Sequence, residues 1–373
     1  MKILFLYLKA FSFTGGIEKF NRSLLKALHE LSVDGLIDAD AISAYDKQTD
    51  EKYFPQLRFK GYGGGIERLL FVLVSFFQSF KYKTVILGHI NLAAVGWWIK
   101  RMNPSVRLIL ITHGLEVWKK QHGNKLKVLE EADLILAVSN FTKEKITVLN
   151  PSVNPEKIKI FPNTIDPYFA VPVSFEKPDY LLKRYGLTRS MPVLLTVTRL
   201  AFSEKYKGYD KLIEIMPYLL GKNKNLQYLL CGKADRDEQL RIELLIEKSN
   251  ATGSVKPLGF IKDSELIDHY LLADVFVMQS KQEGFGIVFI EALACGRKVI
   301  AGSKDGSPEA LLNGQLGKLI DPDNNDELKK AIEEALNDQR CNSLELQQKV
   351  IDAFGFHKYK ARLKSYLVNE KLS

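Results

Sequence analysis

The stretch Lys281-Gln-Glu-Gly-Phe-Gly-Ile-Val-Phe-Ile-Glu-Ala-Leu-Ala-Cys-Gly296 decides the fold and the chemistry that this chain is expected to have. It places Glu283 just before a loop that contains Gly284 and Gly286. A second acid, Glu291, lies inside the helix that this loop is predicted to open. Glycines let backbone N–H groups approach a ligand closely, and the first turn of a helix offers N–H groups without a partner inside the helix. Such amides suit a diphosphate, and ionised carboxylates accept hydrogen bonds from hydroxyl groups, so the stretch predicts a site for a nucleotide-sugar.

Outward from this stretch, apolar β-rich runs alternate with helical patterns along the chain. This alternation is typical of parallel sheets whose two faces are covered by helices. In the first half, strands are predicted at Ile3–Leu8, Thr84–Gly88, Arg107–Thr112, Leu134–Ser139 and Lys157–Phe161. After the first of these runs, Gly16–Leu31 carries apolar residues at helical spacing and predicts a helix.

Residues 166–190 differ in composition from their neighbours, with Pro167, Pro172 and Pro178 among mixed charges. Such a composition is typical of a connector between domains. A second alternation follows, with strands predicted at Met191–Thr198, Leu226–Cys231, Val255–Leu258, Val275–Gln279 and Val299–Ala301. Helices are predicted at Tyr209–Gly221, Asp237–Ser249, Asp263–Leu272, Gly286–Cys295, Asp326–Asp338 and Tyr359–Val368. Two alternations in tandem predict an α/β protein with two Rossmann-like domains.

Short motifs follow many of the predicted strands. They are Thr14-Gly15-Gly16-Ile17-Glu18, Thr112-His113-Gly114, Phe161-Pro162-Asn163-Thr164-Ile165-Asp166, Thr198-Arg199-Leu200, Lys207-Gly208, Leu258-Gly259-Phe260 and Ser307-Pro308-Glu309. In this order, and with seven residues between the two acids of the first stretch, they resemble the family 4 retaining glycosyltransferases of the GT-B fold and their E-x7-E motif. The resemblance covers nearly the whole chain and implies two Rossmann-like domains whose parallel sheets face each other across a cleft. It implies an acceptor-binding domain at 1–170, to which a C-terminal helix at 355–373 returns, and a donor-binding domain at 171–354.

The resemblance also implies roles for charged residues of the second domain. Glu283 would bind hydroxyl groups of the transferred sugar, and Glu291 would bind the ribose hydroxyls of the nucleotide. Arg199 and Lys207 would neutralise the diphosphate and stabilise its charge as it leaves. Because of an insert between Arg199 and Lys207, Lys205 could instead contact the diphosphate. We assign this role to Lys207, because the glycine that follows it matches the family's pattern. The amides of Phe285, Gly286, Ile287 and Val288 would face the diphosphate or the sugar, and Gly284 is assigned to the same donor site.

Five further residues are assigned to the site through the resemblance. The Gly15-Gly16 turn after the first strand leaves room for a phosphate or an acceptor to approach backbone amides. His113 resembles the family's active-site histidine, which contacts the donor sugar near the reacting carbon. Asn163 would lie at the cleft, and Phe260 would lie in the donor site. The turn after the first strand does not have the G-x-G-x-x-G spacing, which argues against a dinucleotide dehydrogenase.

No metal and no cofactor are expected beside the nucleotide-sugar substrate. The letters D-x-D, a signature of metal-dependent transferases, occur at Asp38-Ala-Asp40 and Asp321-Pro-Asp323. The first lies in a polar segment, and the second precedes a predicted helix, where acids serve as ordinary caps. The resemblance implies that Arg199 and Lys207 take the place of a metal.

Composition indicates an ordinary soluble globular protein, with 46% hydrophobic and 26% charged residues. The three cysteines, Cys231, Cys295 and Cys341, are widely spaced and odd in number, which indicates free thiols in a reducing compartment. The apolar run before Lys9 is too short for a secretion signal and no small-residue cleavage site follows it. We therefore expect a cytoplasmic protein, located at the inner face of the membrane if it contacts lipid.

The net charge of +9 is unevenly distributed. Residues 1–165 carry 23 Lys and Arg against 15 Asp and Glu, whereas residues 166–373 carry 30 against 29. This bias predicts an anionic partner. Nucleic acid is not favoured, because the sequence has no run of Lys and Arg residues and no helix-turn-helix pattern. Residues 65–83 are apolar, aromatic and flanked by bases, but shorter than the ~20 apolar residues that span a bilayer. This segment would either lie in the interface of an anionic membrane or pack as a buried helix on its own sheet.

The sequence thus predicts transfer of a sugar from a UDP- or GDP-sugar to a hydroxyl group of a glycan or lipid-linked acceptor. Retention of the anomeric configuration is implied by the resemblance alone. The expected setting is the synthesis of cell-envelope polysaccharide, lipopolysaccharide or glycolipid. Two alternatives stay open: another GT-B enzyme, such as a nucleotide-sugar epimerase or a phosphorylase, and a non-catalytic subunit of a glycan assembly complex.

Overall fold

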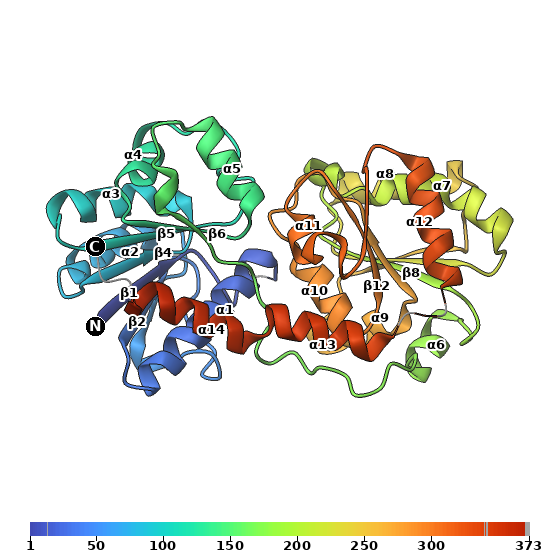
Figure 1. Cartoon of the computed structure of the whole chain (residues 1–373), viewed down its shortest axis with the longest axis horizontal. Helices are drawn as coiled ribbons and strands as arrows, with labels where there is room; N and C mark the ends of the chain where they lie inside the picture. The colour runs from blue at the N-terminus through green and yellow to red at the C-terminus, as the bar shows by residue number, and fades with distance from the viewer. Residues whose placement is uncertain (13, 339, 341, 370–373) are drawn as a thin grey trace. The chain divides into compact units, whose positions relative to one another are not determined.

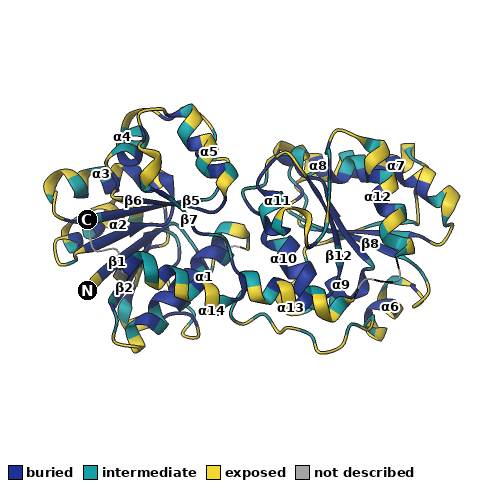
Figure 2. Ribbon diagram, in the orientation of Figure 1, coloured by how far each residue is buried: buried dark blue, intermediate teal, exposed yellow. Residues whose placement is uncertain are grey.

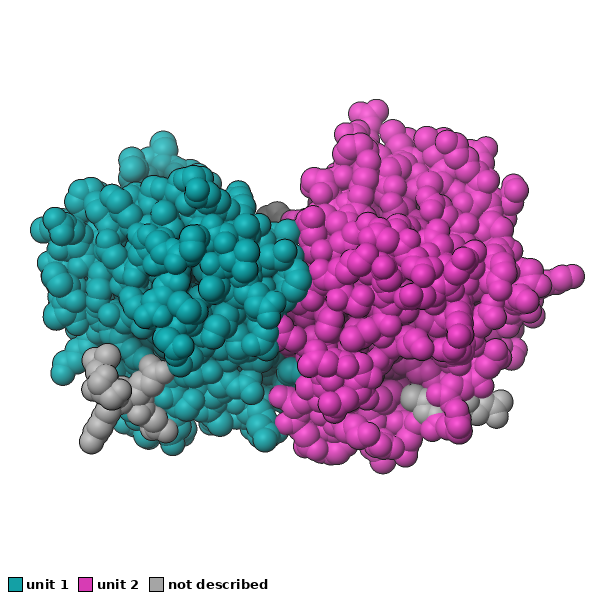
Figure 3. Space-filling view, turned by 45° about the horizontal axis from the view of Figure 1, so that its top comes forward, with its two compact units in different colours: residues 1–168, 354–373 teal, residues 169–353 magenta. Residues whose placement is uncertain are grey.

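The chain forms two compact units in the computed structural model, which describes residues 1–12, 14–338, 340 and 342–369. Unit 1 is Met1–Tyr168 together with Phe354–Ser373, and unit 2 is Phe169–Ala353 (Figure 3). Each unit has its own parallel sheet and its own apolar core, and helices cover both faces of each sheet (Figure 1). The predicted α/β class with two Rossmann-like domains is confirmed.

Unit 1 is built on a seven-stranded sheet in the order β3-β2-β1-β4-β5-β6-β7. The strands are β1 (Lys2–Tyr7), β2 (Asp38–Ser43), β3 (Phe59–Gly61), β4 (Thr84–Leu87), β5 (Arg107–Thr112), β6 (Leu134–Ala137) and β7 (Ile158–Ile160). Neighbouring strands pair in parallel, so their carboxyl ends meet at one edge of the sheet. The central strand β4 is buried along its whole length, which explains why it reads as a continuous apolar run.

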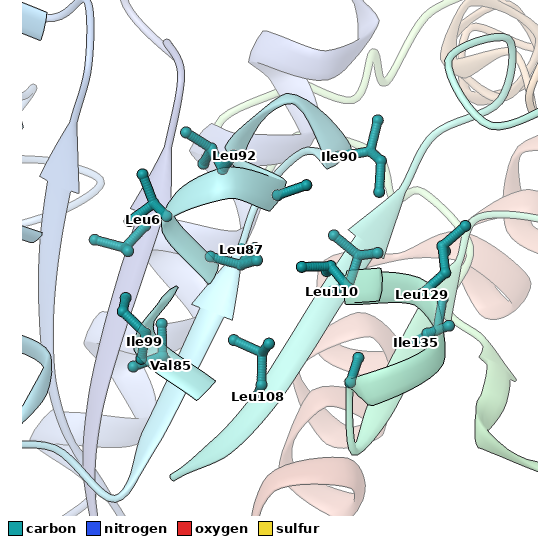
Figure 4. Packing of buried hydrophobic residues seen from close by; sticks show 14 of the residues in the cluster. Leu6, Val85, Leu87, Ile90, Leu92, Ile99, Leu108, Leu110, Leu129 and Ile135 are labelled. Atoms are coloured by element: carbon teal, nitrogen blue, oxygen red, sulfur yellow. The ribbon is translucent and has the colours of Figure 1, made fainter. Parts of the chain in front are cut away.

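Two groups of helices cover the faces of this sheet. One face carries α2 (Glu67–Ser79), α3 (Ala93–Met102), α4 (Gly123–Glu131) and α5 (Asn140–Leu149), which share an apolar cluster with the strands. Figure 4 shows part of this cluster, with Leu6 of β1 and Leu110 of β5 among its members. Because side chains alternate along a strand, Phe5 and Tyr7 point to the opposite face. The helices α1 (Gly16–Val33) and α14 (Phe356–Lys364) pack side by side in this unit.

Unit 2 is built on a six-stranded parallel sheet in the order β10-β9-β8-β11-β12-β13. The strands are β8 (Val193–Val197), β9 (Gln227–Cys231), β10 (Val255–Gly259), β11 (Val275–Met278), β12 (Lys298–Gly302) and β13 (Lys318–Ile320). The helices α7 (Tyr209–Lys222), α8 (Arg236–Lys248) and α12 (Asn325–Asn337) share one apolar cluster with these strands. On α9 (Asp263–Leu272) and α10 (Ile287–Ala294), Tyr270 and Phe289 pack against Phe276 of β11. Further helices are α6 (Asp179–Tyr185), α11 (Ser307–Ala310) and α13 (Ser343–Phe354).

The strand order reverses at one place in each sheet. In unit 1 the reversal lies between β1 and β4, and in unit 2 it lies between β8 and β11. The two loops that leave such a pair of strands run to opposite faces of the sheet and leave room for a ligand at the carboxyl ends. The loops after β1, β4, β8 and β11 are therefore the places where binding residues are expected.

The C-terminal helix packs back on the N-terminal domain, as the resemblance implied. The hydroxyl of Thr164 and the amide of Ile165 both donate to the carbonyl of Phe354, at 2.7 and 3.0 Å. Tyr359 of α14 packs on Phe161, with ring centroids 4.4 Å apart. The expected helix at 355–373 consists of α14 and a π-helical turn at Ser365–Asn369, and residues 370–373 lie outside the described part of the chain.

Several elements were not predicted from the sequence. The sequence pattern indicates a polar segment around the first D-x-D, but this motif lies in β2, where Asp38 and Asp40 both pair with Arg58. The strand was not recognised because its acids make the segment look polar. They are accommodated in the sheet because both pair with Arg58, which lies in another segment. The connector at 166–190 contains the short helix α6, which was also missed.

Residues 65–83 contain α2, which packs on its own sheet but is buried on one side only. Phe71 enters the core of unit 1, but Leu69, Leu73 and Phe77 are 69%, 53% and 66% exposed. In the described part of the chain, no helix has both the length and the apolar character needed to cross a lipid bilayer.

The cysteines that the structure describes are buried free thiols. Cys231 ends β9, and Cys295 follows α10. Burial raises the pKa of both thiols, which keeps them protonated at neutral pH. The third cysteine of the sequence, Cys341, lies outside the described residues.

Candidate donor site at the switch point of unit 2

The loops that leave β8 and β11 bring a lysine and an acid together. Lys207 ends the 3-10 segment η4 (Phe202–Lys207), and Glu283 lies in the loop after β11. The Nζ atom of Lys207 is 2.5 Å from Oε2 of Glu283, and the two side chains are 14% and 20% exposed. Burial by itself lowers the pKa of the Lys207 ammonium, but the charge and hydrogen bond of Glu283, together with Tyr206 and Asp305, raise it overall, so the lysine stays charged. The pair places a fixed cation beside an acceptor of hydroxyl hydrogen bonds.

Gly208 lets these two loops approach closely. It has a φ of +81°, and a Cβ atom at this position would lie 2.7 Å from the carbonyl oxygen of Gln279. The side-chain amide of Gln279 donates to the carbonyl of Gly208 at 2.7 Å, and the amide of Lys281 donates to the carbonyl of Tyr206 at 3.0 Å. These contacts join the loops after β8 and β11 and hold the lysine beside its acid.

Asp305 anchors the main chain of Glu283, and the sequence analysis missed it. Its carboxylate accepts the N–H of Glu283 at 2.6 Å and the N–H of Ser307 at 2.9 Å. The amide of Gly306 donates to the carbonyl of Glu283 at 2.8 Å, which closes the contact between the two loops. Burial raises the pKa of Asp305 to about 6. In the sequence, Asp-Gly-Ser-Pro reads only as a turn, so nothing local revealed this role.

The N-terminus of α10 follows Glu283 directly. Gly286 is its N-cap, in a left-handed conformation with a φ of +92°, and no side chain of the described residues caps it. The first-turn amides of Ile287 and Val288 therefore have no acceptor within the helix, and the helix dipole adds partial positive charge there. The ring of Phe285 is buried and anchors the loop in the core. Gly284 and the four residues whose amides are expected to face the donor thus lie in this loop and in the first turn of α10.

Glu291 lies one turn further along α10 and is buried. Its Oε2 atom accepts the hydroxyl of Tyr270 from α9 at 2.9 Å. Burial and then the charge of Glu291 raise the pKa of Tyr270, so this phenol stays a donor. A buried acid needs a partner, and here Tyr270 supplies one. The burial of Glu291 is thus explained without a ligand, and its assignment to ribose rests on the resemblance.

The insert before Lys207 forms η4 and engages the other two bases of the region. Arg199 follows β8, and its guanidinium pairs with Glu204 of η4, while its side chain is 73% exposed. Lys205 lies over the ring of Phe202, with its Nζ atom 3.6 Å from the ring centroid. Of the two competing lysines, Lys207 is the one beside Glu283 in this structure. Glu204, which is buried, was not predicted to contact Arg199.

Phe260 presents an exposed ring at the same edge of the sheet. It follows β10, is 56% exposed, and comes after Gly259, whose φ is +69°. An exposed aromatic ring offers a flat surface on which another ring can stack.

The second D-x-D is enclosed by lysines. The Oδ1 atom of Asp321 is 2.6 Å from Nζ of Lys304, and Asp323 pairs with Lys281. These lysines lower the pKa of both acids. Within the described part of the chain, no group of three or more His, Cys, Asp or Glu side chains could hold a metal ion.

In unit 1, the loop after β1 is held by Asp46, another residue that the sequence analysis missed. Asp46 is 2% exposed, and its carboxylate accepts the N–H groups of Ala10 at 2.6 Å and Ser12 at 2.8 Å. The loop leads to Gly15, the N-cap of α1. Apart from its chain neighbours and its own helix backbone, a Cβ atom on Gly16 would meet no atom of the described residues within 4 Å.

His113 follows β5 and is held by the loop after β4. Its Nε2 atom is 2.8 Å from the carbonyl oxygen of Gly88. Because a carbonyl only accepts, Nε2 carries a proton, and in the tautomer with a single ring proton Nδ1 is an acceptor. The ring packs edge-on against Phe20 and faces His89, with centroids 4.9 and 6.0 Å away. Burial lowers the pKa of His89 to about 4, so this neighbour is neutral at neutral pH.

Asn163 lies in the loop after β7 and is half-buried. Its neighbour Thr164 is fixed by the hydrogen bond to Phe354 described above. The anchor for the returning C-terminal segment therefore also fixes the loop that carries Asn163.

Two family models match the chain, one in each half. The model described as Glycosyltransferase Family 4 matches residues 14–169, and the model described as Glycosyl transferases group 1 matches residues 183–353. The GDP-mannose-dependent monoacylated alpha-(1-6)-phosphatidylinositol monomannoside mannosyltransferase of Corynebacterium glutamicum is 30% identical over 243 residues, 62% of this chain and 61% of that protein. The GDP-mannose-dependent alpha-(1-6)-phosphatidylinositol monomannoside mannosyltransferase of Mycolicibacterium smegmatis is 29% identical over 260 residues, 65% of this chain and 64% of that protein. The chain therefore spans less than two thirds of the length of these relatives.

Among solved structures, Anabaena HepE in complex with UDP and glucose is similar, with a TM-score of 0.79 and 20% identity. The likeness covers 99% of this chain and 100% of that chain, and at this identity it bears on the fold alone. The two family models, taken together, reach through both units of the structure. The chain is a member of glycosyltransferase family 4 and has the GT-B fold.

Proposed function

We propose that this protein is a retaining glycosyltransferase that moves a sugar from a UDP- or GDP-sugar to a hydroxyl group of a glycan or lipid-linked acceptor. The observation that carries the proposal is the Lys207–Glu283 pair beside the N-terminus of α10, which no described side chain caps. A lysine and helix amides stabilise a bound diphosphate, and they stabilise it more as it gains charge on leaving. Retention of configuration is taken from the family.

In the proposed reaction, the bond between the anomeric carbon and the diphosphate oxygen breaks, and the acceptor oxygen bonds to the same face of the sugar. The leaving diphosphate, stabilised by Lys207 and the first-turn amides of α10, takes the proton of the acceptor hydroxyl. Glu283 holds the sugar through its hydroxyl groups. Lys207 and Asp305 fix this acid before the donor arrives, so little reorganisation is needed during the reaction.

Two assigned residues would have to change or share partners. Arg199 would reach the diphosphate by leaving Glu204 or by using another nitrogen of its guanidinium. Glu291 would bind ribose while it keeps the hydrogen bond from Tyr270, since a carboxylate has about four acceptor positions. In unit 1, His113 keeps the role that the resemblance implies, with Nδ1 as its acceptor.

The substrate classes are proposed from the named relatives. Both mannosyltransferases are GDP-mannose-dependent and named for a phosphatidylinositol mannoside, and HepE was crystallised with UDP and glucose. UDP- and GDP-sugars are therefore the donors to test first, with lipid-linked glycans as acceptors. The proposed setting is cell-envelope polysaccharide or glycolipid synthesis on the cytoplasmic side of the membrane.

The test is a transfer assay with radiolabelled UDP- and GDP-sugars and extracted lipid-linked acceptors. Lys207→Ala should abolish transfer, and Lys205→Ala, in the same loop but directed at Phe202, should leave it nearly unchanged. Full transfer by a well-folded Lys207→Ala variant would refute the assignment. A new sugar nucleotide made from donor alone would favour an epimerase. Failure to bind UDP, GDP or ADP in calorimetry would favour a non-catalytic subunit.

A further inference from the structure

The helix α2 has an exposed face that is apolar and a buried face that is partly polar. The exposed side chains are Ile66, Leu69, Leu70, Leu73, Phe77 and Phe80, each between 49% and 88% exposed. Their spacing of three, four and seven residues places them on one side of the helix. The buried residues of α2 are Phe71, Ser75 and Ser79. A surface helix of a soluble protein shows the reverse pattern, so the outer side of α2 is adapted to an apolar environment.

The neighbouring helix α3 extends this apolar face. α2 and α3 contact each other and cover the same face of the unit 1 sheet, so their outer sides look in the same direction. Ile99 of α3 points into the core (Figure 4), whereas Trp98 and Met102 are 52% and 57% exposed. Exposed positions recur along both helices in Figure 2. We call the outer sides of α2 and α3 together the docking face.

Basic residues accompany the docking face. The exposed ones are Arg68, Lys81, Lys83 and Arg101. Residues 65–83 and 93–102 together hold five Lys and Arg against one acid, Glu67. That acid is already engaged, since its carboxylate lies 3.6 Å from the Nζ atom of Lys47. The face therefore combines apolar and aromatic side chains with a net positive charge.

We propose that unit 1 binds the surface of an anionic lipid bilayer through the docking face. Apolar side chains would enter the boundary between headgroups and acyl chains, and the bases would meet anionic headgroups. At 13 residues and about 1.5 Å per residue, α2 is roughly 20 Å long, shorter than the ~30 Å hydrocarbon core, so it lies along the interface. A symmetric dimer through this face is disfavoured because it would oppose the same bases.

The proposal goes beyond sugar transfer and is tested without a donor or acceptor. The full chain is sedimented with phosphatidylcholine vesicles that contain about 30% phosphatidylglycerol, and with pure phosphatidylcholine vesicles. All three tryptophans of the chain, Trp97, Trp98 and Trp118, lie in unit 1, so a blue shift of their emission reports insertion. We expect binding to the anionic vesicles only, weakened by salt.

Variants separate the apolar and the electrostatic contributions. Leu70→Ser with Leu73→Ser should weaken vesicle binding at least tenfold, because two apolar side chains are lost from the contact. Lys81→Gln with Lys83→Gln should weaken it roughly 25-fold, because each base near an anionic surface contributes a factor of about five.

A matched control lies in unit 2. Leu240 and Leu244 of α8 are 52% and 54% exposed, against 52% and 53% for Leu70 and Leu73. Leu240→Ser with Leu244→Ser should leave vesicle binding unchanged. Equal melting temperatures would show that both serine variants are folded. Unchanged nucleotide binding in calorimetry would show that the donor site is intact, so a failure of vesicle binding is distinguished from a failure of the transferase assignment.

Three results would overturn the proposal. They are absence of binding to the anionic vesicles, equal binding by the Leu70→Ser/Leu73→Ser variant, and a wild-type dimer in ultracentrifugation that this variant abolishes. The last result would assign the docking face to a second copy of the chain.

Discussion

Replacing Asp305 by Asn tests whether the anchor behind Glu283 does what its geometry indicates. The pKa of Asp305 is raised from an ordinary 3.8 to about 6 by burial. One pKa unit corresponds to about 1.4 kcal/mol, so the ionised carboxylate costs the folded state about 3 kcal/mol at neutral pH. Asn removes this cost but accepts only one of the two N–H groups, and leaving a buried donor without an acceptor costs about 1–3 kcal/mol. At pH 7 the two effects nearly cancel.

The pH dependence of stability then distinguishes the two proteins. Because the pKa of Asp305 is higher in the folded than in the unfolded state, the folded state binds the proton more tightly between pH 4 and 6. Wild-type stability therefore gains about 3 kcal/mol from this group as the pH falls through that window. Asp305→Asn lacks this gain. The stability difference, wild type minus variant, should rise by about 3 kcal/mol from pH 7 to pH 4.

The assay is urea unfolding followed by far-UV circular dichroism, because the tryptophans report only on unit 1 and Asp305 lies in unit 2. Hydrogen exchange of the Glu283 amide measures the anchor directly, and its protection should fall in the variant. Loss of one charged hydrogen bond, about 1.5–3 kcal/mol, should lower kcat/KM at least tenfold at pH 7. A stability difference that does not vary with pH, together with unchanged exchange at Glu283, would refute the role of Asp305.

Three further predictions follow from contacts in the structure. Lys207→Met and Glu283→Gln should each lower the free energy of unfolding of unit 2, measured with urea. In a double-mutant cycle, the double variant should lose about 2 kcal/mol less than the sum of the two single losses; additive losses would show that the two side chains are not coupled. Gly208→Ala should lower the melting temperature measured by circular dichroism and reduce the free energy of unfolding by about 1–2 kcal/mol or more, because φ is +81° and the added Cβ would clash with Gln279. An unchanged melting temperature would contradict the need for glycine. Thr164→Val should cost about 1 kcal/mol in tryptophan-monitored unfolding of unit 1, since the carbonyl of Phe354 keeps its bond from Ile165; no change would mean that the hydroxyl does not anchor the C-terminal segment.

The fold was predictable because its signal is carried by neighbouring residues in the sequence. Buried strands such as β4 and β5 read as apolar runs, and the motifs that follow β1, β5 and β11 stand where parallel strands end. β2 was missed because its acids face Arg58, which lies in another segment. Local pattern cannot reveal a strand whose polar side chains are paired by distant residues.

The sequence selected Gly208, Gly286, Lys207 and Glu283 by their residue types, but it did not predict that the lysine and the acid form a pair. Gly208 and Gly286 adopt positive φ, and Lys207 meets Glu283. Asp305 and Asp46 were not predicted, because a carboxylate that accepts hydrogen bonds from distant backbone amides produces no pattern in the sequence around it.

The sequence also left α2 undecided between burial and a membrane interface. An apolar sequence indicates that the segment is removed from water, but it does not show whether it contacts protein or lipid. The exposure of Leu69, Leu73 and Phe77 decides against burial within this chain.

A crystal structure of the full chain with bound UDP or GDP would show whether the loops after β8 and β11 hold the nucleotide. We predict that the diphosphate lies against the Nζ atom of Lys207 and the first-turn amides of α10, with Glu283 beside the sugar. A nucleotide bound away from the loops that follow β8 and β11, or with its diphosphate out of reach of Lys207, would contradict it.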